Sequence, residues 1–322
     1  MIRYPRPNKK KRDAMLKANE HVETEWNRKY PHPSVAADIV AFGLRVSDPV
    51  YWRAQEDMKV SLVLVRRGRS THVGKWALPG GFFLTKDPNF EICARREMLE
   101  ETGLDVRALI PMGTFSDVGR DGRGWVMSIP FLAIINKSDM CVARPRGGDD
   151  AIEAKWFDVS WSKDDKAHTM RIILDSGSAE KFEFRAIWEG EGFGQPKMRV
   201  TYLDKAEKLA FDHAEIVATA LYNLGLPGKR MRAFAFLGEE FTIAELRFVY
   251  SFMLGIPEDL IRQFSKGEIV ECEEGTKILL KKLIPQNFRR DIIKYLELSG
   301  NVSDGMGHRP AAKYRWTKNR PL

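Results

Sequence analysis

The sequence predicts an α/β protein in which an α/β sandwich is followed by a smaller helical module that ends in a short strand. Runs rich in β-branched and aromatic residues recur at residues 35–44, 60–66, 108–115 and 126–136, and such runs are typical of strands. A helical pattern lies between the second and third runs, so strands and helices alternate. Beyond residue 238 helical patterns dominate. These observations indicate two domains of different class.

The chain has 322 residues, which is enough for two domains with their own cores. We divide it into a basic N-terminal arm at 1–34, a first domain at 35–228 and a second domain at 238–322. Cys93, Cys141 and Cys272 are too scattered for a disulfide framework or a zinc site. No apolar run reaches the length of a transmembrane helix, and the arm lacks the apolar region of a secretory signal. We expect a cytoplasmic protein with no membrane partner.

Three carboxylates fall on one face of a predicted helix. Glu97, Glu100 and Glu101 are spaced i, i+3 and i+4, so they spread over about 100° of the helix surface. Their mutual repulsion calls for a cation, and a hard divalent metal takes oxygen ligands of this kind. The simpler alternative is an acidic amphipathic helix whose glutamates are solvated, with Ile92, Met98 and Leu99 buried. Both alternatives predict a helix.

The ends of this helix are marked by residues with known preferences. Asp87 followed by Pro88 predicts a start, with the aspartate as N-cap and the proline at the first helical position. Gly103 suits the left-handed position that ends a helix. The helix is therefore expected to follow Asp87 and to end before Gly103.

The glycine pair Gly80-Gly81 and the string from Arg96 to Leu104 together closely resemble the Nudix box. The resemblance implies an α/β/α sandwich, and it implies that water attacks a diphosphate joined to another group. It assigns catalysis to Arg96, Glu97, Glu100 and Glu101, with the three glutamates as ligands of Mg²⁺ (or Mn²⁺). Two departures stand out: the spacing from Gly81 to Arg96 is one residue longer than in the family, and the first glutamate of the box is replaced by Asp87 or lost.

Four further strands and a closing helix are expected in the first domain. Residues 155–157 predict a strand near the site, and 170–174, 181–188 and 197–203 predict three strands separated by glycine-containing turns. We interpret the region of about 163–203 as an inserted β-meander, for which a subunit contact is the simplest role. Residues 209–224 predict a helix that resembles the closing helix of Nudix domains. Its His213 invites a catalytic role, although a single helical histidine is more often a packed residue.

The second domain has the layout of a winged helix-turn-helix. Thr242 to Glu245 form a capping box that starts one helix, and residues 286–296 predict a second, basic helix. The turn Gly305–Pro310 and a strand at 313–316 would form the wing. The last 46 residues carry eleven Lys and Arg against three Asp and Glu, so they account for the whole net charge of +8. A charge gathered in this way favours a polyanionic partner over an evenly solvated surface.

DNA is the polyanion that such a module reads, because its second helix enters the major groove. The alternatives are a solvated tail, a protein-interaction module or a dimerisation domain. The residues expected to contact DNA are polar or basic and lie on the second helix and the wing: Asn287, Arg289, Arg290, Lys294, His308, Arg309 and Lys313.

Taken together, the two halves resemble the Nudix-related transcriptional regulators of the NrtR type. The matching phrases are Leu-Ala-Phe-Asp-His-Ala from Leu209, Asn-Phe-Arg-Arg from Asn287 and Arg-Pro-Ala-x-x-Tyr from Arg309. That family responds to ADP-ribose or a related nucleotide or sugar ligand. By the same resemblance, Gly80, Gly81, Arg120, Asp121 and Arg123 would bind the ligand, since arginine binds phosphate oxygens in a bidentate way. The segment around Arg120 also fits a mobile, solvated loop.

Two functions follow from this resemblance. The first is a homodimeric transcriptional regulator that binds DNA through its winged helix and senses ADP-ribose or a similar metabolite. The second is a Mg²⁺-dependent Nudix hydrolase that cleaves a nucleoside diphosphate derivative such as ADP-ribose. The complete set of glutamates favours metal binding, whereas the lengthened spacing before Arg96 favours loss of turnover.

Overall fold

The computed structural model describes most of the chain, in these ranges: 29–47, 57–69, 71–106, 108–148, 150–190, 196–203, 207–226, 232–268, 270, 272, 274–302 and 311–317. All but the last residues of the predicted arm at 1–34 lie outside these ranges, as does the predicted turn Gly305–Pro310.

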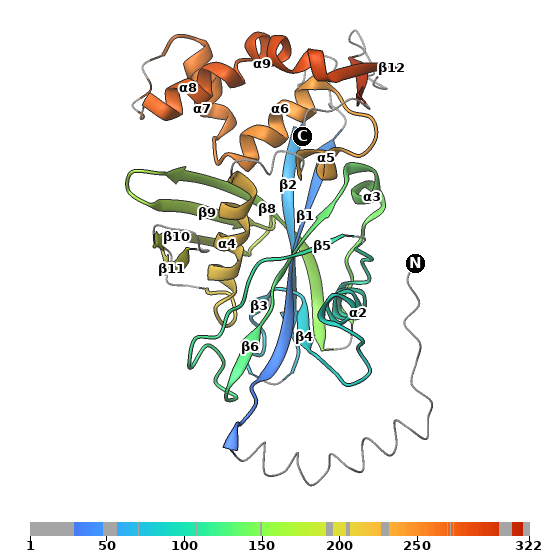
Figure 1. Cartoon of the computed structure of the whole chain (residues 1–322), viewed down its shortest axis with the longest axis vertical. Coiled ribbons are helices and arrows are strands. Elements are labelled where there is room, and N and C mark those ends of the chain that lie inside the picture. Colours follow the sequence, from blue (N-terminus) through green and yellow to red (C-terminus); the bar gives the residue numbers. More distant parts are fainter. Residues whose placement is uncertain are drawn as a thin grey trace.

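One large mixed sheet forms the body of the molecule (Figure 1). Its path runs β11-β10-β9-β8-β2-β1-β7-β5, and β3, β4 and β6 pair with β2 or β1 beside that path. Two long strands near its middle, β1 (Ser34–Ser47) and β2 (Asp57–Arg67), are antiparallel. The remaining strands are β3 (Trp76–Ala77), β4 (Gly80–Phe82), β5 (Leu109–Pro111), β6 (Val126–Ser128), β7 (Phe131–Ile135), β8 (Ala151–Asp164), β9 (Thr169–Asp175), β10 (Lys181–Glu189) and β11 (Lys197–Tyr202).

Helices cover both faces of this sheet, as the predicted sandwich requires. Alternate residues of β1 divide between two apolar clusters, because successive side chains of a strand point to opposite faces. Ile39 and Ala41 join the cluster that contains α2 (Phe90–Thr102) and α3 (Lys137–Val142). Val40 and Phe42 join the cluster that contains α4 (His213–Gly225). Figure 1 shows α2 and α4 on opposite sides of the sheet.

Several predicted strands form with different lengths. The run at 126–136 is divided into β6 and β7, and Pro130 between them has no N–H to continue the ladder. The expected strand at 108–115 is reduced to the three residues of β5, whereas the one at 155–157 is part of the fourteen-residue β8. The three strands predicted within 163–203 form as β9, β10 and β11. They pair in succession onto β8, so they continue the central sheet.

The C-terminal part is helical and ends in a two-stranded hairpin, as the predicted winged layout requires. The capping box at Thr242 is present, with reciprocal bonds between Thr242 and Glu245. The predicted basic helix at 286–296 is too long at its end, since it gives way to a 3₁₀ turn at Ile293–Tyr295 and Leu296 begins a strand. The elements are α5 (Arg232–Leu237), α6 (Ile243–Met253), α7 (Glu258–Ser265), α8 (Glu274–Leu283), α9 (Pro285–Ile292), β12 (Leu296–Val302) and β13 (Ala312–Trp316).

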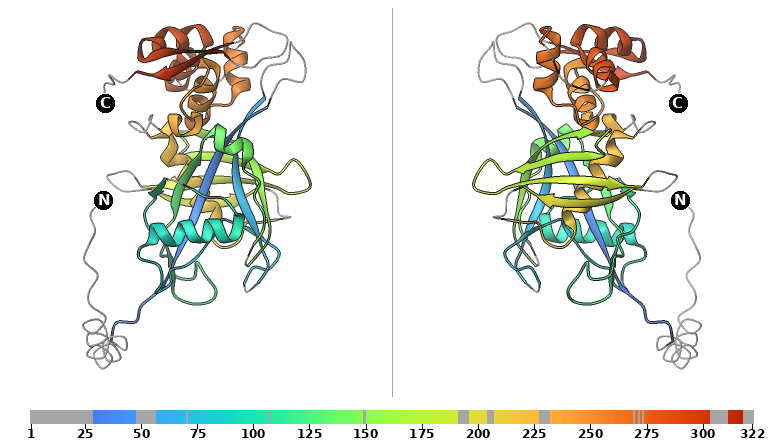
Figure 2. Two further views of the ribbon diagram at one scale, coloured as in Figure 1. Left: turned by 90° about the vertical axis from the view of Figure 1, so that its right-hand side faces the viewer. Right: turned by 90° about the vertical axis from the view of Figure 1, so that its left-hand side faces the viewer.

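The helical part is seated on one end of the sheet, where β1 and β2 reach it (Figures 1 and 2). Phe252 of α6 meets Phe42 of β1 and Trp161 of β8 edge-on, at centroid distances of 6.2 and 6.4 Å. Lys137 of α3 donates to both carboxylate oxygens of Glu245 at 2.7 and 2.8 Å. An apolar cluster and a partly buried ion pair thus join the two parts. In the described parts of the chain, no helix is both long and apolar enough to span a bilayer.

Candidate functional site

A cleft of about 720 Å³ lies where β4, α2, the loop at 120–123 and the start of α4 meet. All nine residues expected from the sequence to catalyse or bind a ligand line it: Gly80, Gly81, Arg96, Glu97, Glu100, Glu101, Arg120, Asp121 and Arg123. They come from segments far apart in the sequence. The fold therefore brings the predicted catalytic and ligand residues into one site.

The helix α2 begins two residues later than predicted. Asn89 is its N-cap and accepts a hydrogen bond from the Ile92 backbone N–H at 2.9 Å, so the assignment of Asp87 as N-cap is wrong. Gly103 ends the helix in the left-handed conformation, as predicted. Ile92 and Leu99 are exposed, against the alternative of a simple amphipathic helix that buries them, and Met98 is buried. The inner face of α2 is instead lined by smaller residues and by two of the glutamates.

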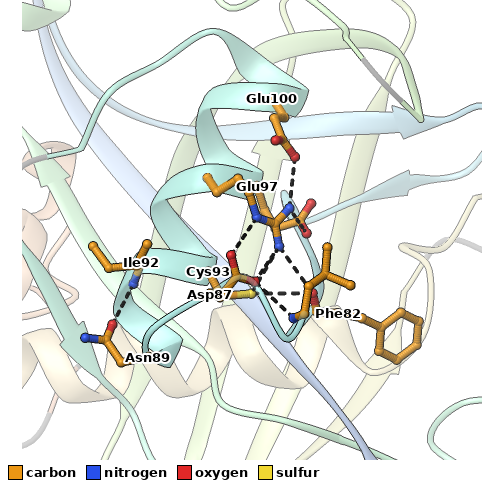
Figure 3. Close-up of polar contacts among 9 residues, drawn as sticks. Phe82, Asp87, Asn89, Ile92, Cys93, Glu97 and Glu100 are labelled. Carbon is orange, nitrogen blue, oxygen red and sulfur yellow. Dashed lines mark hydrogen bonds and ion pairs between the residues drawn. The ribbon is translucent and has the colours of Figure 1, made fainter. Parts of the chain in front are cut away.

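Asp87 instead anchors Arg96. The guanidinium donates to both oxygens of Asp87, from Nε at 3.0 Å and from Nη2 at 2.8 Å, which is a bidentate pair (Figure 3). The Leu84 backbone N–H donates to the same carboxylate at 3.0 Å. The Arg96 hydrogen bond, followed by the Leu84 one, holds the pKa of Asp87 well below its ordinary value despite burial. Asp87 thus stays ionised beneath the cleft.

Arg96 also reaches two of the three glutamates. Its Nη1 donates to Glu97 at 2.6 Å and to Glu100 at 2.9 Å. Figure 3 shows where Asp87, Glu97 and Glu100 lie, on and beside α2. The hydrogen bond to Asp87, and then those to Glu100 and Glu97, raise the pKa of Arg96. One buried cation therefore orients three carboxylates.

Glu101 has a different environment. It is buried, and one of its oxygens accepts the Gly80 backbone N–H at 2.9 Å. Burial, with further repulsion from Glu97 and Asp38, raises the pKa of Glu101 to about 8. Gly81 lies so near that a Cβ there would sit 2.5 Å from the Glu97 carboxyl carbon. The glycine pair therefore allows the backbone to approach the carboxylates closely.

This group suits a hard divalent cation by its chemistry. The possible ligands are carboxylate oxygens, which hard divalent cations prefer. In the arrangement seen here Arg96 stands between Glu97 and Glu100. No three Asp, Glu, His or Cys side chains within the described ranges converge as a metal-binding group. Metal ligation by Glu97, Glu100 and Glu101 stays a prediction.

The sequence analysis missed Asp38, which lies inside the cleft on β1. Ser128 donates to it at 2.5 Å, and His213 Nε2 is 3.7 Å from its other oxygen. His213 is fully buried, and its Nδ1 accepts the Leu78 backbone N–H at 2.8 Å. Burial lowers the pKa of His213, so this histidine is neutral and fastens α4 to the segment before β4. The signal for Asp38 was a lone carboxylate in the apolar run 35–44.

Arg120 forms a bidentate ion pair within the protein. Its Nε and Nη2 donate to the two oxygens of Asp212, at 2.8 and 2.6 Å, and its side chain is only 5% exposed. The loop around it is therefore anchored at this residue, which contrasts with the alternative of a mobile, solvated segment. Arg120 borders the cleft as a bound side chain, and its contact with a ligand stays a prediction.

Arg123 and Arg67 form the cationic wall of the cleft around an aromatic ring. The Arg123 guanidinium carbon lies 4.8 Å from the Phe82 ring centroid and 5.5 Å from that of Phe211. Arg67 lies 5.0 Å from the same Phe211 ring. Asp121 accepts from Arg123 Nη2 at 2.6 Å. Burial and then repulsion by Arg123 lower the pKa of Arg67. The basic pair Arg66-Arg67 at the end of a predicted strand was the available signal for this residue.

Among the predicted DNA-contacting residues, those that the structure describes do not line this cleft and belong to the C-terminal part. Arg289, Arg290 and Lys294 are exposed, and Lys313 is half-buried. Asn287 donates to the Lys281 carbonyl at 2.9 Å, so it closes the end of α8. His308 and Arg309 lie outside the described residues. Three exposed lysines of α8 that the sequence analysis did not select extend the basic surface: Lys277, Lys281 and Lys282.

The fold and the carboxylate-lined cleft define the class of the first domain, and a family model supports it. Residues 44–175 match the model of the NUDIX domain. The chain therefore contains a NUDIX domain, and the resemblance inferred from Arg96 to Leu104 is confirmed. Enzymes of the Nudix hydrolase family depend in general on a divalent metal.

Two curated proteins share sequence with this chain. One is an ADPR-responsive transcriptional repressor NtrR of Acinetobacter baylyi, 32% identical over 33% of this chain and 39% of its own length. The other is an ADP-ribose pyrophosphatase of Methanocaldococcus jannaschii, 34% identical over 41% of this chain and 66% of its own length. The chain thus spans less than two thirds of each relative.

Solved structures extend the likeness of fold over most of the chain. A MutT/nudix family protein from Enterococcus faecalis is 22% identical, with a TM-score of 0.56 over 98% of this chain and 100% of that one. Shewanella oneidensis NrtR, solved in complex with a 27mer DNA, is 20% identical, with a TM-score of 0.50 over 88% of this chain and 93% of that one. The predicted combination of a Nudix sandwich with a C-terminal helical module is confirmed at the level of fold.

Proposed function

We propose that this protein is a transcriptional regulator that binds DNA through its C-terminal module and senses ADP-ribose, or a related nucleotide or sugar metabolite, in its NUDIX cleft. The observation that carries the proposal is that one apolar cluster joins an exposed basic module to a cleft lined by arginines and carboxylates. A relative named as an ADPR-responsive repressor supports the same combination. We propose that this regulator is cytoplasmic.

The cleft suits a ligand that carries phosphate groups and a flat ring. Arg123 and Arg67 supply guanidinium groups, which bind phosphate oxygens. Phe82 and Phe211 supply aromatic rings at the cleft wall, and Gly80 and Gly81 line it without side chains. A volume of about 720 Å³ is within the range of sites that hold small molecules. We assign ligand contacts to Gly80, Gly81, Arg120, Asp121 and Arg123.

We propose that Mg²⁺, or Mn²⁺ in its place, binds at Glu97, Glu100 and Glu101. A bound divalent cation would neutralise phosphate charge and lower the pKa of a water molecule. Arg96 would orient the glutamates from beneath, because its guanidinium already holds Asp87, Glu97 and Glu100. Charge stabilisation around the phosphates is the contribution that such a site makes to phosphate chemistry.

We propose that the DNA surface consists of α9 with the hairpin β12–β13, and that two chains act together on a palindromic site. Two-fold symmetric dimers match the symmetry of such operators. The contacts assigned to this surface are those of Asn287, Arg289, Arg290, Lys294, His308, Arg309 and Lys313. Within this scheme the ligand acts only if it binds the DNA-competent and DNA-free states with different affinity.

A second candidate function is hydrolysis of a nucleoside diphosphate derivative such as ADP-ribose. The specific observation in its favour is that Glu97, Glu100 and Glu101 all line the cleft, a complete set that a protein that only senses a ligand does not need. A relative named as an ADP-ribose pyrophosphatase supports it as well.

One pair of measurements tests both functions. In the first, DNA from the region upstream of the protein's own gene is titrated with the protein, with and without ADP-ribose, against random DNA of the same length. Specific binding that ADP-ribose changes is expected, and equal binding to both DNAs would exclude the regulator. In the second, Mg²⁺-dependent release of AMP from ADP-ribose is compared between the parent and Glu101→Gln. No AMP release by the parent, with Glu101→Gln behaving like the parent, would exclude the hydrolase.

A further inference from the structure

Tyr314 of β13 lies between β12 and the segment that precedes α6. Its register partner in the hairpin is Leu298 of β12. On the opposite side it exchanges two hydrogen bonds with Phe241, which directly precedes the first helix of the module, at 2.8 and 3.1 Å. Its side chain is buried. The position of the tyrosine ring is therefore determined by the hairpin and by the start of α6 together.

The hydroxyl group of this fixed ring meets the basic helix. Arg289 of α9 donates from Nη2 to the Tyr314 hydroxyl at 3.3 Å, across 25 residues of sequence. Arg289 is exposed and lies one residue after Phe288, which anchors α9 in the core. The tyrosine thus restricts where the end of an otherwise free, long side chain lies.

A hydroxyl group does this without neutralising the arginine. In the described part of the module, Arg289 has no carboxylate partner, whereas Arg290 pairs with Asp291 and Arg315 pairs with Glu240. A guanidinium has five N–H donors, so one bond to an oxygen leaves four donors and the full charge. Arg289 is therefore both positioned and electrostatically available to an anion.

We infer that Tyr314 is a positioning residue for DNA binding, which holds the Arg289 guanidinium in place for a phosphate or a base edge of the duplex. The inference rests on the proposed DNA-binding function and refines it. A guanidinium that is already ordered loses less side-chain entropy when DNA binds. The contribution of Tyr314 must then act through Arg289 and disappear when Arg289 is absent.

A double-mutant cycle tests this dependence, using the full chain and the upstream DNA at several salt concentrations. The proteins are the parent, Tyr314→Phe, Arg289→Ala and the double variant, with Tyr295→Phe as a matched tyrosine control. We expect Tyr314→Phe to weaken specific binding about threefold to tenfold, since a hydrogen bond to a charged group is lost. Arg289→Ala should weaken it about tenfold or more, and the double variant should bind like Arg289→Ala alone.

Salt dependence and thermal unfolding separate positioning from a general loss of structure. Tyr314→Phe keeps the charge of Arg289, so the slope of log K against log salt should be unchanged, whereas Arg289→Ala should lower it by about 0.9. The thermal midpoint should be the same for Tyr314→Phe and Tyr295→Phe. An equal effect of Tyr314→Phe with and without Arg289 would overturn the inference. If the parent does not prefer upstream over random DNA, the proposed function fails first and the inference falls with it.

Discussion

Charged side chains are paired and largely buried in the cleft of the NUDIX domain, whereas they are exposed on the basic surface of the C-terminal module. In the cleft, Arg96 is largely buried and bonded to Asp87, Glu97 and Glu100, so each charge has a defined partner and position. On the basic surface, Arg289 and its neighbours are exposed to solvent. A buried charge needs a partner at a defined position, because a buried charge without one destabilises the fold. Exposed cations attract an anionic partner through their summed charge, and salt screens that attraction. The two regions should therefore respond to substitution in different ways.

The largest effect is expected where a buried cation is removed. Arg96→Ala leaves Asp87 and Glu97 buried without their partner, and breaking such a network costs about 3–5 kcal/mol of unfolding free energy. Denaturant unfolding measures this loss. The matched control is the neighbour Arg95, which pairs with the exposed Glu91 at 3.6 Å, and Arg95→Ala should lose less unfolding free energy than Arg96→Ala. Similar losses for the two variants would contradict the view that geometry governs the cleft.

A smaller effect is expected from crowding the cleft while keeping its charges. A Cβ at Gly81 would lie 2.5 Å from the Glu97 carboxyl carbon, so Gly81→Ala displaces that side chain from Arg96. We expect about tenfold weaker binding of Mn²⁺, measured by calorimetry, since overpacking of this kind costs about 1–3 kcal/mol. Gly122→Ala is the control, because a Cβ there meets nothing within 4 Å. Unchanged Mn²⁺ affinity in Gly81→Ala would show that the cation site does not include Glu97.

The basic surface should respond through salt dependence. Lys281 and Lys282 are exposed at the end of α8, next to the turn that leads into α9. If both contact phosphates, replacing them with alanine should lower the slope of log K against log salt by about 2 in DNA titrations. The affinity of the cleft for ADP-ribose should stay the same in this variant. A lower affinity for the nucleotide, with the salt slope unchanged, would place these lysines outside the DNA surface.

The sequence predicted best what depends on local pattern. Gly103 as the helix end and the capping box at Thr242 each involve neighbours in sequence, and both are present. The strands at 170–174, 181–188 and 197–203 were predictable from alternation. That they extend the main sheet was not, because strand order depends on contacts between distant segments.

The residues that the sequence did not reveal are partners made by the fold. Asp212 lies 92 positions from Arg120, and no local pattern connects them. Asp87 was misassigned as an N-cap because its carboxylate binds the Arg96 side chain instead of capping the helix. Tyr314 likewise meets Arg289 only after the hairpin has formed. Residue types in the site could be predicted, while the pairing between them required the tertiary structure.

Glu215 on α4 is a half-buried carboxylate that can be compared with Asp87 beneath the cleft. Glu215 has no cationic partner among the residues described, and burial, with a smaller effect from Asp212, raises its pKa to about 7. Asp87 is also buried, yet Arg96 keeps its pKa low. The folded state therefore binds the proton of Glu215 more tightly than the unfolded state does. Stability contributed by this group is present below its ordinary pKa of 4.5 and is lost as pH rises through about 7.

Glu215→Gln removes this titration and should give the smallest of the effects considered. Relative to the variant, the parent should lose unfolding free energy between pH 5 and pH 8, because only the parent must ionise a carboxylate in a poorly solvated position. Urea unfolding at both pH values measures the difference, and the exposed Glu207→Gln serves as the control. A gap between parent and variant that does not change with pH would mean that Glu215 is solvated in the folded protein. Glu215 would then respond to pH like the exposed charges of the basic surface.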